Sequence, residues 1–115
     1  MTTQRERMLA GELYDPFDPE LVAARERVRD LLWKLNAKPA PERELLQQIF
    51  GRGGDSVWMQ PPFYCDYGTN IECGERVFFN FNCVVLDTGK VTSGDYCQCG
   101  SGVQLLTPLH PLDGP

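Results

Sequence analysis

The chain has 115 residues, a length that suits one domain and excludes two large ones. With 42% hydrophobic and 23% charged residues, it has the composition of a globular protein and not of a disordered one. Eleven Lys and Arg against sixteen Asp and Glu give a net charge of −5, which argues against nucleic acid or an anionic membrane as a partner. No apolar leader opens the chain and no stretch approaches the ~18 apolar residues of a membrane span, so we expect a cytoplasmic protein.

Residues 1–52 carry helical signals. Thr3 and Glu6 form a capping-box pattern, which predicts a short first helix. Asp18, followed by proline, predicts the start of a longer second helix. In that helix the apolar residues recur at helical spacing: Leu21, Val28, Leu31, Leu32 and Leu35. Residues 41–50 predict a third short helix, which a cluster of glycines ends.

A six-residue repeat replaces the helical pattern from residue 55 onward. Two neighbouring apolar columns consist of Cys65, Ile71, Val77 and Cys83, and of Tyr67, Cys73, Phe79 and Val85. After a shift of two residues, one column continues as Val91, Cys97, Val103 and Leu109. Apolar residues at this period, with Gly or Asn at the turns, are typical of a hexapeptide β-helix, in which short strands form the sides of a triangular prism. Residues 55–109 would supply about three coils.

We therefore expect a mainly β protein with a helical N-terminus, divided into a helical segment over 1–54 and a β-helix over 55–115. The repeat also accounts for the cysteines, which all fall in the inward columns: Cys65, Cys73, Cys83, Cys97 and Cys99. Their odd number and the absence of a Cys-x-x-Cys pair fit neither a closed set of disulfides nor a zinc site. We interpret them as small buried hydrophobic residues.

Four segments of the chain match motifs of a known family. They are MLAGELY at 8–14, PPFYCDYGTNI at 61–71, FNFNCVVLD at 79–87 and TPLHPLD at 107–113. Together with the helical front and the hexapeptide repeat, they make the chain similar to the maltose and galactoside O-acetyltransferases, including the nodulation acetyltransferase branch. This resemblance implies a short left-handed parallel β-helix preceded by two or three α-helices. It also implies a homotrimer that transfers acetyl from acetyl-CoA to a sugar hydroxyl.

The resemblance also assigns roles to individual residues. His110 stands at the family's catalytic position, where it would take the proton of the acceptor hydroxyl, and its unperturbed pKa near 6.5 suits a base. Asn80 matches an acceptor-binding Asn, and Asp66, Asp87 and Asp15 are the further acceptor-binding candidates. No metal is required, because acyl transfer from a thioester can run on a general base and oxyanion donors.

Each of these assignments has a simpler alternative. A lone His near a chain end is more often a loop residue than a catalytic one. Asn80 can occupy a tight corner of a coil, and isolated carboxylates are commonly solvated turn residues. The residues that would bind acetyl-CoA are not assigned.

The chain also departs from the family pattern. Family members continue beyond the His-Pro-Leu-Asp segment with coils that form most of the acetyl-CoA groove, so we expect a member truncated at its C-terminus. Ser93, Cys97 and Cys99 stand where larger aliphatic residues are usual, and Thr88 replaces an acid. An inward Ser93 would leave a hydroxyl that needs a partner.

The sequence is also compatible with two other functions. The chain can be a catalytically inactive paralogue or fragment that acts only as an interaction module. Alternatively, the scaffold can carry a different acceptor specificity, since related proteins acetylate serine, chloramphenicol or amino sugars.

Overall fold

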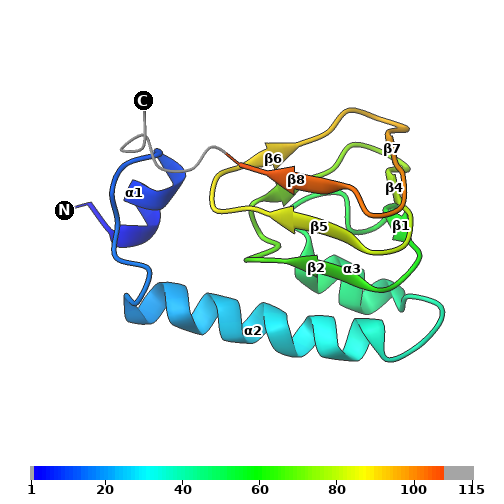
Figure 1. Ribbon diagram of the computed structural model, residues 1–115, viewed down its shortest axis with the longest axis horizontal. Helices are drawn as coiled ribbons and strands as arrows, with labels where there is room; N and C mark the ends of the chain where they lie inside the picture. Colours follow the sequence, from blue (N-terminus) through cyan, green and yellow to red (C-terminus); the bar gives the residue numbers. More distant parts are fainter. Residues whose placement is uncertain (1, 108–115) are drawn as a thin grey trace.

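The computed structural model describes residues 2–107, in which three helices precede eight short strands (Figure 1). The helices are α1 (Gln4–Leu9), α2 (Pro19–Asn36) and α3 (Arg43–Ile49). The strands are β1 (Trp58–Met59), β2 (Phe63–Cys65), β3 (Ile71–Glu72), β4 (Phe78–Phe79), β5 (Cys83–Leu86), β6 (Val91–Thr92), β7 (Gln98–Cys99) and β8 (Gln104–Leu106). The predicted class, mainly β with a helical N-terminus, is confirmed. No helix in this part of the chain has the length and apolar character needed to cross a membrane.

The helix starts are as predicted. The Thr3 hydroxyl accepts the Glu6 N–H at 3.0 Å, and the Glu6 carboxylate accepts the Thr3 N–H at 2.8 Å, which completes the capping box. Asp18 caps α2 by accepting the Glu20 N–H at 3.1 Å. The buried residues of α2 are the five that the helical spacing predicts: Leu21, Val28, Leu31, Leu32 and Leu35.

The strands stack into three small parallel sheets, which are the three sides of a β-helix. Their orders are β1-β4-β7, β2-β5-β8 and β3-β6. Every strand pair joins residues that are 20 positions apart, as in Phe63 with Cys83 and Ile71 with Val91. Because three hexapeptides supply only 18 residues, each coil contains two additional residues.

The position of these additional residues corrects the register expected from the sequence. They occur at the same corner of successive coils, between Cys65 and Ile71 and again between Val85 and Val91, whereas the repeat pattern reveals only the second. Tyr67 therefore lies outside the inward columns. It is buried instead against Met8 and Leu21 of the helical segment.

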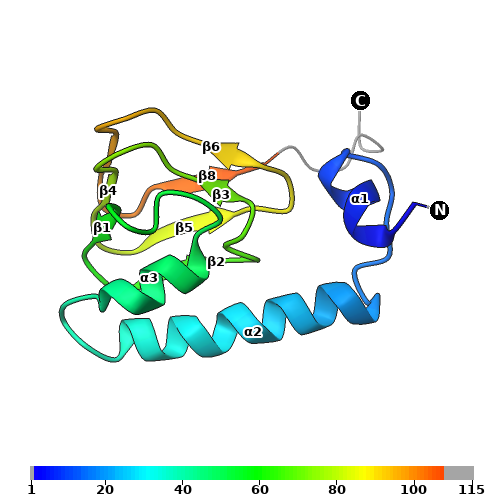
Figure 2. The same ribbon diagram turned by 180° about the vertical axis from the view of Figure 1, so that it is seen from behind.

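Helices close the first coil and cover one side of it (Figures 1 and 2). Leu46 and Ile49 of α3, with the following Phe50, belong to the same core as the inward side chains of the first two coils. The ring of Phe50 lies 5.5 Å from that of Phe63 and 6.2 Å from that of Phe79, between centroids. The longer α2 packs on α3 and along β2.

The cysteines behave as small core residues, as predicted. Cys73 and Cys83 are buried, the other three are partly buried, and all five are free thiols. Burial raises the pKa of the Cys73 thiol to about 11, and it also raises the pKa of Cys65, so these thiols are protonated at neutral pH. Among residues 2–107 no group of three or more His, Cys, Asp or Glu side chains has an arrangement that could hold a metal ion.

The third coil contains the polar residue that the sequence marks as unusual. The Ser93 hydroxyl is buried and has no hydrogen-bond partner within the described chain, as expected for a serine at an inward position. The neighbouring Thr92 is exposed on the outer surface of the same strand.

Replacing Ser93 by Val is expected to raise the free energy of unfolding by about 1 kcal/mol, because an unpaired hydroxyl is exchanged for an apolar group. Urea unfolding followed by circular dichroism measures this change. Thr92→Val is the matched control, and it should stay within about 0.5 kcal/mol of the original chain. Destabilisation by Ser93→Val would contradict the assignment of this position to the core.

Candidate functional site

The additional residues of each coil form two stacked loops at one corner of the β-helix. We call residues 66–70 the lower corner loop and residues 86–90 the upper corner loop. The lower loop follows β2 and carries Asp66, one of the residues predicted to bind an acceptor. The fold therefore gives this predicted residue a defined position, at the corner that faces α1 and the start of α2.

Asp87, which follows β5, holds the lower corner loop in place. Its side chain is fully buried, and its carboxylate accepts four backbone N–H groups from that loop. The donors are Asp66 at 3.0 Å, Tyr67 at 2.9 Å, Gly68 at 2.8 Å and Asn70 at 3.3 Å. The Asn70 side-chain amide also donates to the Asp87 carbonyl at 2.8 Å. Asp87 faces the corner from inside, so its effect on a bound molecule would pass through the loop that carries Asp66.

The upper corner loop is held in a similar way one coil later. Thr107 lies 20 residues after Asp87 and is also buried. Its hydroxyl donates to the Leu86 carbonyl at 2.8 Å and accepts the Gly89 N–H at 3.1 Å. The Thr88 hydroxyl lies 2.9 Å from it, so the threonine that stands in place of an acid joins this polar group. Each coil thus uses one buried polar side chain to satisfy the backbone of the corner loop below it.

Arg25 of α2 links the lower corner loop to the N-terminal segment. Its Nη1 donates to the Tyr67 hydroxyl at 2.7 Å, and its Nη2 donates to the Pro16 carbonyl at 2.6 Å. The guanidinium carbon lies 5.9 Å from the centre of the Tyr67 ring, within range of a cation–π contact. Arg25 was not among the predicted site residues, although its spacing offered a signal: it falls on the apolar face of α2, four residues after Leu21 and three before Val28.

Asp66 and Asp15 lie on the two segments that Arg25 joins. Burial raises the pKa of the Asp66 carboxyl, and the charge of Arg25 partly opposes that rise. Asp15 is exposed, and its carboxylate accepts the Phe17 N–H at 3.0 Å within its own turn. Its backbone N–H donates to the Gln4 side chain at 2.7 Å. We call Asp66 and Arg25, together with Asp15 on the turn that Arg25 holds through Pro16, the polar corner.

Asn80 lies elsewhere. Asn80 precedes β5, whereas Asp87 and the corner loops follow the strands of the β2-β5-β8 side. The length of β5, about 13 Å, therefore separates Asn80 from Asp87. The Asn80 side-chain oxygen accepts the Phe81 N–H at 2.9 Å, and its backbone N–H donates to the Cys99 carbonyl at 2.9 Å. These contacts match the simpler interpretation of Asn80 as a corner residue. One chain does not bring Asn80 and Asp66 together, and His110 lies outside the described residues.

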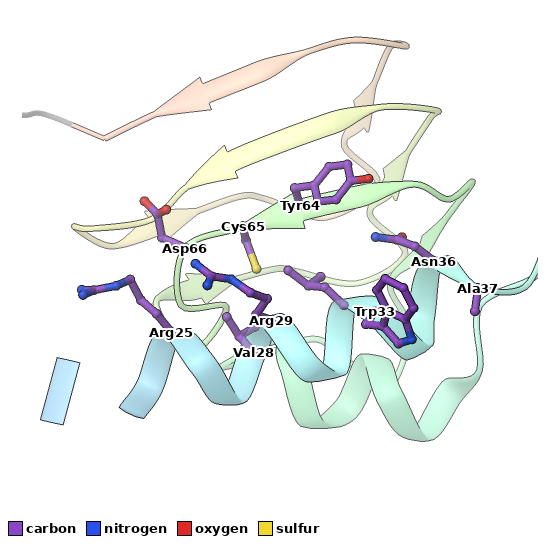
Figure 3. A pocket seen from close by; sticks show the side chains of 10 residues that line it. Arg25, Val28, Arg29, Trp33, Asn36, Ala37, Tyr64, Cys65 and Asp66 are labelled. Carbon is purple, nitrogen blue, oxygen red and sulfur yellow. The ribbon is translucent and has the colours of Figure 1, made fainter. Parts of the chain in front are cut away.

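A groove of about 440 Å³ runs between α2 and β2, beginning at the polar corner. Arg25 and Asp66 lie at one end of it, and Trp33, Asn36 and Tyr64 lie at the other (Figure 3). The volume falls within the range of about 300 to 1,000 Å³ that is usual for small-molecule sites. This groove was not predicted, because it depends on how the helix packs against the sheet.

Substitution of Asp87 tests how the lower corner loop is held. Burial raises the pKa of Asp87 to about 6, although backbone hydrogen bonds, including those from Tyr67, Gly68 and Asp66, oppose that rise. Between about pH 4 and pH 6, the Asp87 carboxyl therefore stays protonated in the folded chain. In the unfolded chain the same carboxyl is ionised, because its ordinary pKa is near 4. The free energy of unfolding should therefore fall between about pH 4 and pH 6, by up to about 3 kcal/mol from this group, and Asp87→Asn should lack that part of the slope.

Urea unfolding at half-unit pH intervals measures the difference between the original chain and Asp87→Asn. Asp55→Asn, at an exposed carboxylate, is the control that keeps the original slope. A difference of the opposite sign would mean that the N–H donors outweigh burial and hold the carboxylate ionised.

Comparison with known proteins finds relatives that share this architecture. The maltose acetyltransferase hexapeptide capping motif matches residues 7–54. Nodulation protein L of Rhizobium meliloti is 42% identical over 115 residues, which cover 96% of this chain and 63% of that protein. The chain spans about 60% of the length of the curated relatives that it matches first.

Two solved structures give the same picture. A maltose O-acetyltransferase from Clostridium difficile superposes with a TM-score of 0.90 at 35% identity, over 98% of this chain and 63% of that one. A hexapeptide-repeat acetyltransferase from Vibrio cholerae, solved with acetyl coenzyme A, gives a TM-score of 0.78 at 34% identity over 90% and 57% of the two chains. The helical front and the coils both take part in these matches, and the chain is similar in sequence and fold to the hexapeptide-repeat acetyltransferases that carry the maltose acetyltransferase capping motif.

Proposed function

We propose that the chain transfers an acetyl group from acetyl-CoA to a hydroxyl of a sugar. The observation that carries this proposal is the superposition of nearly the whole chain on a maltose O-acetyltransferase with a TM-score of 0.90. The structure from Vibrio cholerae that contains acetyl coenzyme A supports the same donor. The polar corner supports a polyhydroxylated acceptor, because carboxylates accept and a guanidinium donates hydrogen bonds to hydroxyl groups.

The reaction joins the acceptor oxygen to the acetyl carbon and breaks the carbon–sulfur bond of the thioester. A neutral hydroxyl is a weak nucleophile, so a base must take its proton as it attacks. We assign that role to His110, which can then pass the proton to the departing thiolate of CoA. Asp66 and Asp15 would orient the hydroxyl groups of the acceptor, and Asp87 would hold Asp66 in position. The proposed reaction uses no metal.

We further propose that the chain works as a homotrimer in which adjacent copies share each site. Asn80 and the lower corner loop stand at opposite ends of the β2-β5-β8 side of one chain. In a ring of identical subunits, each interface joins two different surface patches of the same chain. The patch around Asn80 and the patch around the lower corner loop can be these two. Asn80 of one copy would then complete the polar corner of the next.

A non-catalytic interaction module is the second candidate. The observation in its favour is that, among the described residues, β6, β7 and β8 each leave one edge without a paired strand. Unpaired edges of this kind can associate with another chain.

Release of the CoA thiol in the presence of maltose tests the enzymatic proposal. His110→Ala should lower kcat by about 10²- to 10⁴-fold, because it removes the general base. Asp66→Asn should raise KM for the sugar, whereas the exposed Asp55→Asn should change neither constant. Absence of maltose-dependent thiol release from the folded chain would contradict the proposal and favour the interaction module, whereas full activity of His110→Ala would contradict the assignment of His110 as the general base.

Mixing two variants with impaired acceptor binding tests whether the site is shared. Asn80→Ala and Asp66→Ala chains are unfolded together and refolded as mixed trimers, with the trimer mass measured by light scattering. If each site combines Asn80 of one copy with Asp66 of the next, about a quarter of the sites in the mixed trimers contain both original residues. Activity should then recover toward a quarter of that of the original chain. Activity no higher than that of the separate variants would show that the two residues do not meet across an interface.

A further inference from the structure

The groove between α2 and β2 continues well beyond the polar corner. Arg25 and Trp33 are eight residues apart on α2, which corresponds to about 12 Å along the helix. One hexose ring at Asp66 would therefore leave the far end of the groove unfilled. The residues of that far end are of a different kind from those of the polar corner (Figure 3).

Two aromatic side chains line the far end. Trp33 is 78% exposed and Tyr64 is 49% exposed, although their neighbours Leu32 and Phe63 are buried in the core. Trp33 comes from α2 and Tyr64 from β2, so the two walls of the groove each contribute one ring. Large exposed aromatic rings that border a groove mark a binding surface more often than an inert one. By contrast the other tryptophan, Trp58, has Arg43 stacked 5.4 Å from its ring centre.

The polar groups of the groove select the kind of ligand. Arg29, in the middle of α2, makes no hydrogen bond or ion pair with residues 2–107, so its guanidinium can donate to a ligand. The Asn36 amide is already occupied, because it bonds the Phe63 backbone N–H at 2.9 Å and carbonyl at 3.0 Å. At the other end, the Asp66 carboxylate can accept hydrogen bonds, and the Arg25 guanidinium is already engaged by Tyr67 and Pro16. Aromatic faces, a free donor and an acidic acceptor together suit a neutral sugar chain.

We propose that the far end of the groove is a second sugar subsite, formed by Trp33 and Tyr64, and that the acceptor is an oligosaccharide of at least two rings. The reacting ring lies at Asp66 and Arg25, and the following ring stacks between the two aromatic side chains. This inference rests on the proposed function for the identity of the reacting end. The aromatic subsite itself is a binding site and can be tested without catalysis.

The test compares sugars of increasing length. Glucose, maltose and maltotriose are titrated into the full chain by isothermal calorimetry, and cellobiose and cellotriose are used to compare the other linkage. In the Trp58→Phe background, the emission of Trp33 reports stacking directly. We expect the trisaccharide of one series to bind about tenfold more tightly than glucose, with a shift of the Trp33 emission.

Variants of the aromatic residue separate stacking from folding. Trp33→Ala should lower the affinity for the trisaccharide to that for glucose, and Trp33→Phe should restore most of the difference, because it keeps a ring. Trp58→Phe alone is the matched control and should leave every affinity unchanged. Because Trp33 is largely exposed, its replacement should leave the circular dichroism spectrum and the urea midpoint unchanged.

The two proposals fail in different ways. Length-dependent binding that requires Trp33, without thiol release, would support the second subsite and contradict the transferase. Thiol release with equal KM for glucose and both trisaccharides, unaffected by Trp33→Ala, would support the transferase and overturn the second subsite. Absence of binding by any of these sugars would also overturn it.

Discussion

The buried carboxylate of Asp87 satisfies the backbone of the loop on which the rest of the candidate site depends. A coil of 18 residues could close without that loop, but the additional residues at this corner expose N–H groups that have no partner in a sheet. Four of them donate to the carboxylate of Asp87, which belongs to the coil above the loop. An unpaired buried N–H costs about 1 to 3 kcal/mol, so this one side chain decides whether the loop has a single conformation.

The fixed loop in turn connects the β-helix to the helical segment. Tyr67, within the loop, packs against Met8 and Leu21 and receives the hydrogen bond of Arg25. Arg25 also holds the turn that precedes α2 through the Pro16 carbonyl. The position of α2, and with it the second wall of the groove, therefore depends on the same corner. This coupling explains why a helical capping segment can contribute residues to a site on the β-helix.

Much of this fold could be predicted from the sequence because its signals are local. The capping pair at Thr3 and Glu6 and the proline after Asp18 mark helix starts through contacts only a few residues apart. The apolar columns identify a β-helix, since stacked coils bury residues at a fixed period. The additional residues of the first coil could not be recognised in the repeat pattern, because Tyr67 is apolar and falls six residues before Cys73.

The candidate site was less predictable, because its geometry depends on contacts between distant segments. Asp66 and Asn80 both lie in recognisable motifs, but only the order of strands shows that they stand at opposite ends of one side. An arginine on a helix usually faces solvent, so the contacts of Arg25 with Tyr67 and Pro16 could not be foreseen from its identity. The exposure of Trp33 depends likewise on how α2 packs against β2.

The corner held by Asp87 is, in our proposal, the end of the molecule that receives a sugar. Backbone NMR of the ¹⁵N-labelled chain, titrated with maltose, tests it most directly. We expect the largest amide shift changes in residues 66–70 and around Arg25, with smaller changes toward Trp33. Shift changes confined to other coils, or none at saturating maltose, would contradict it.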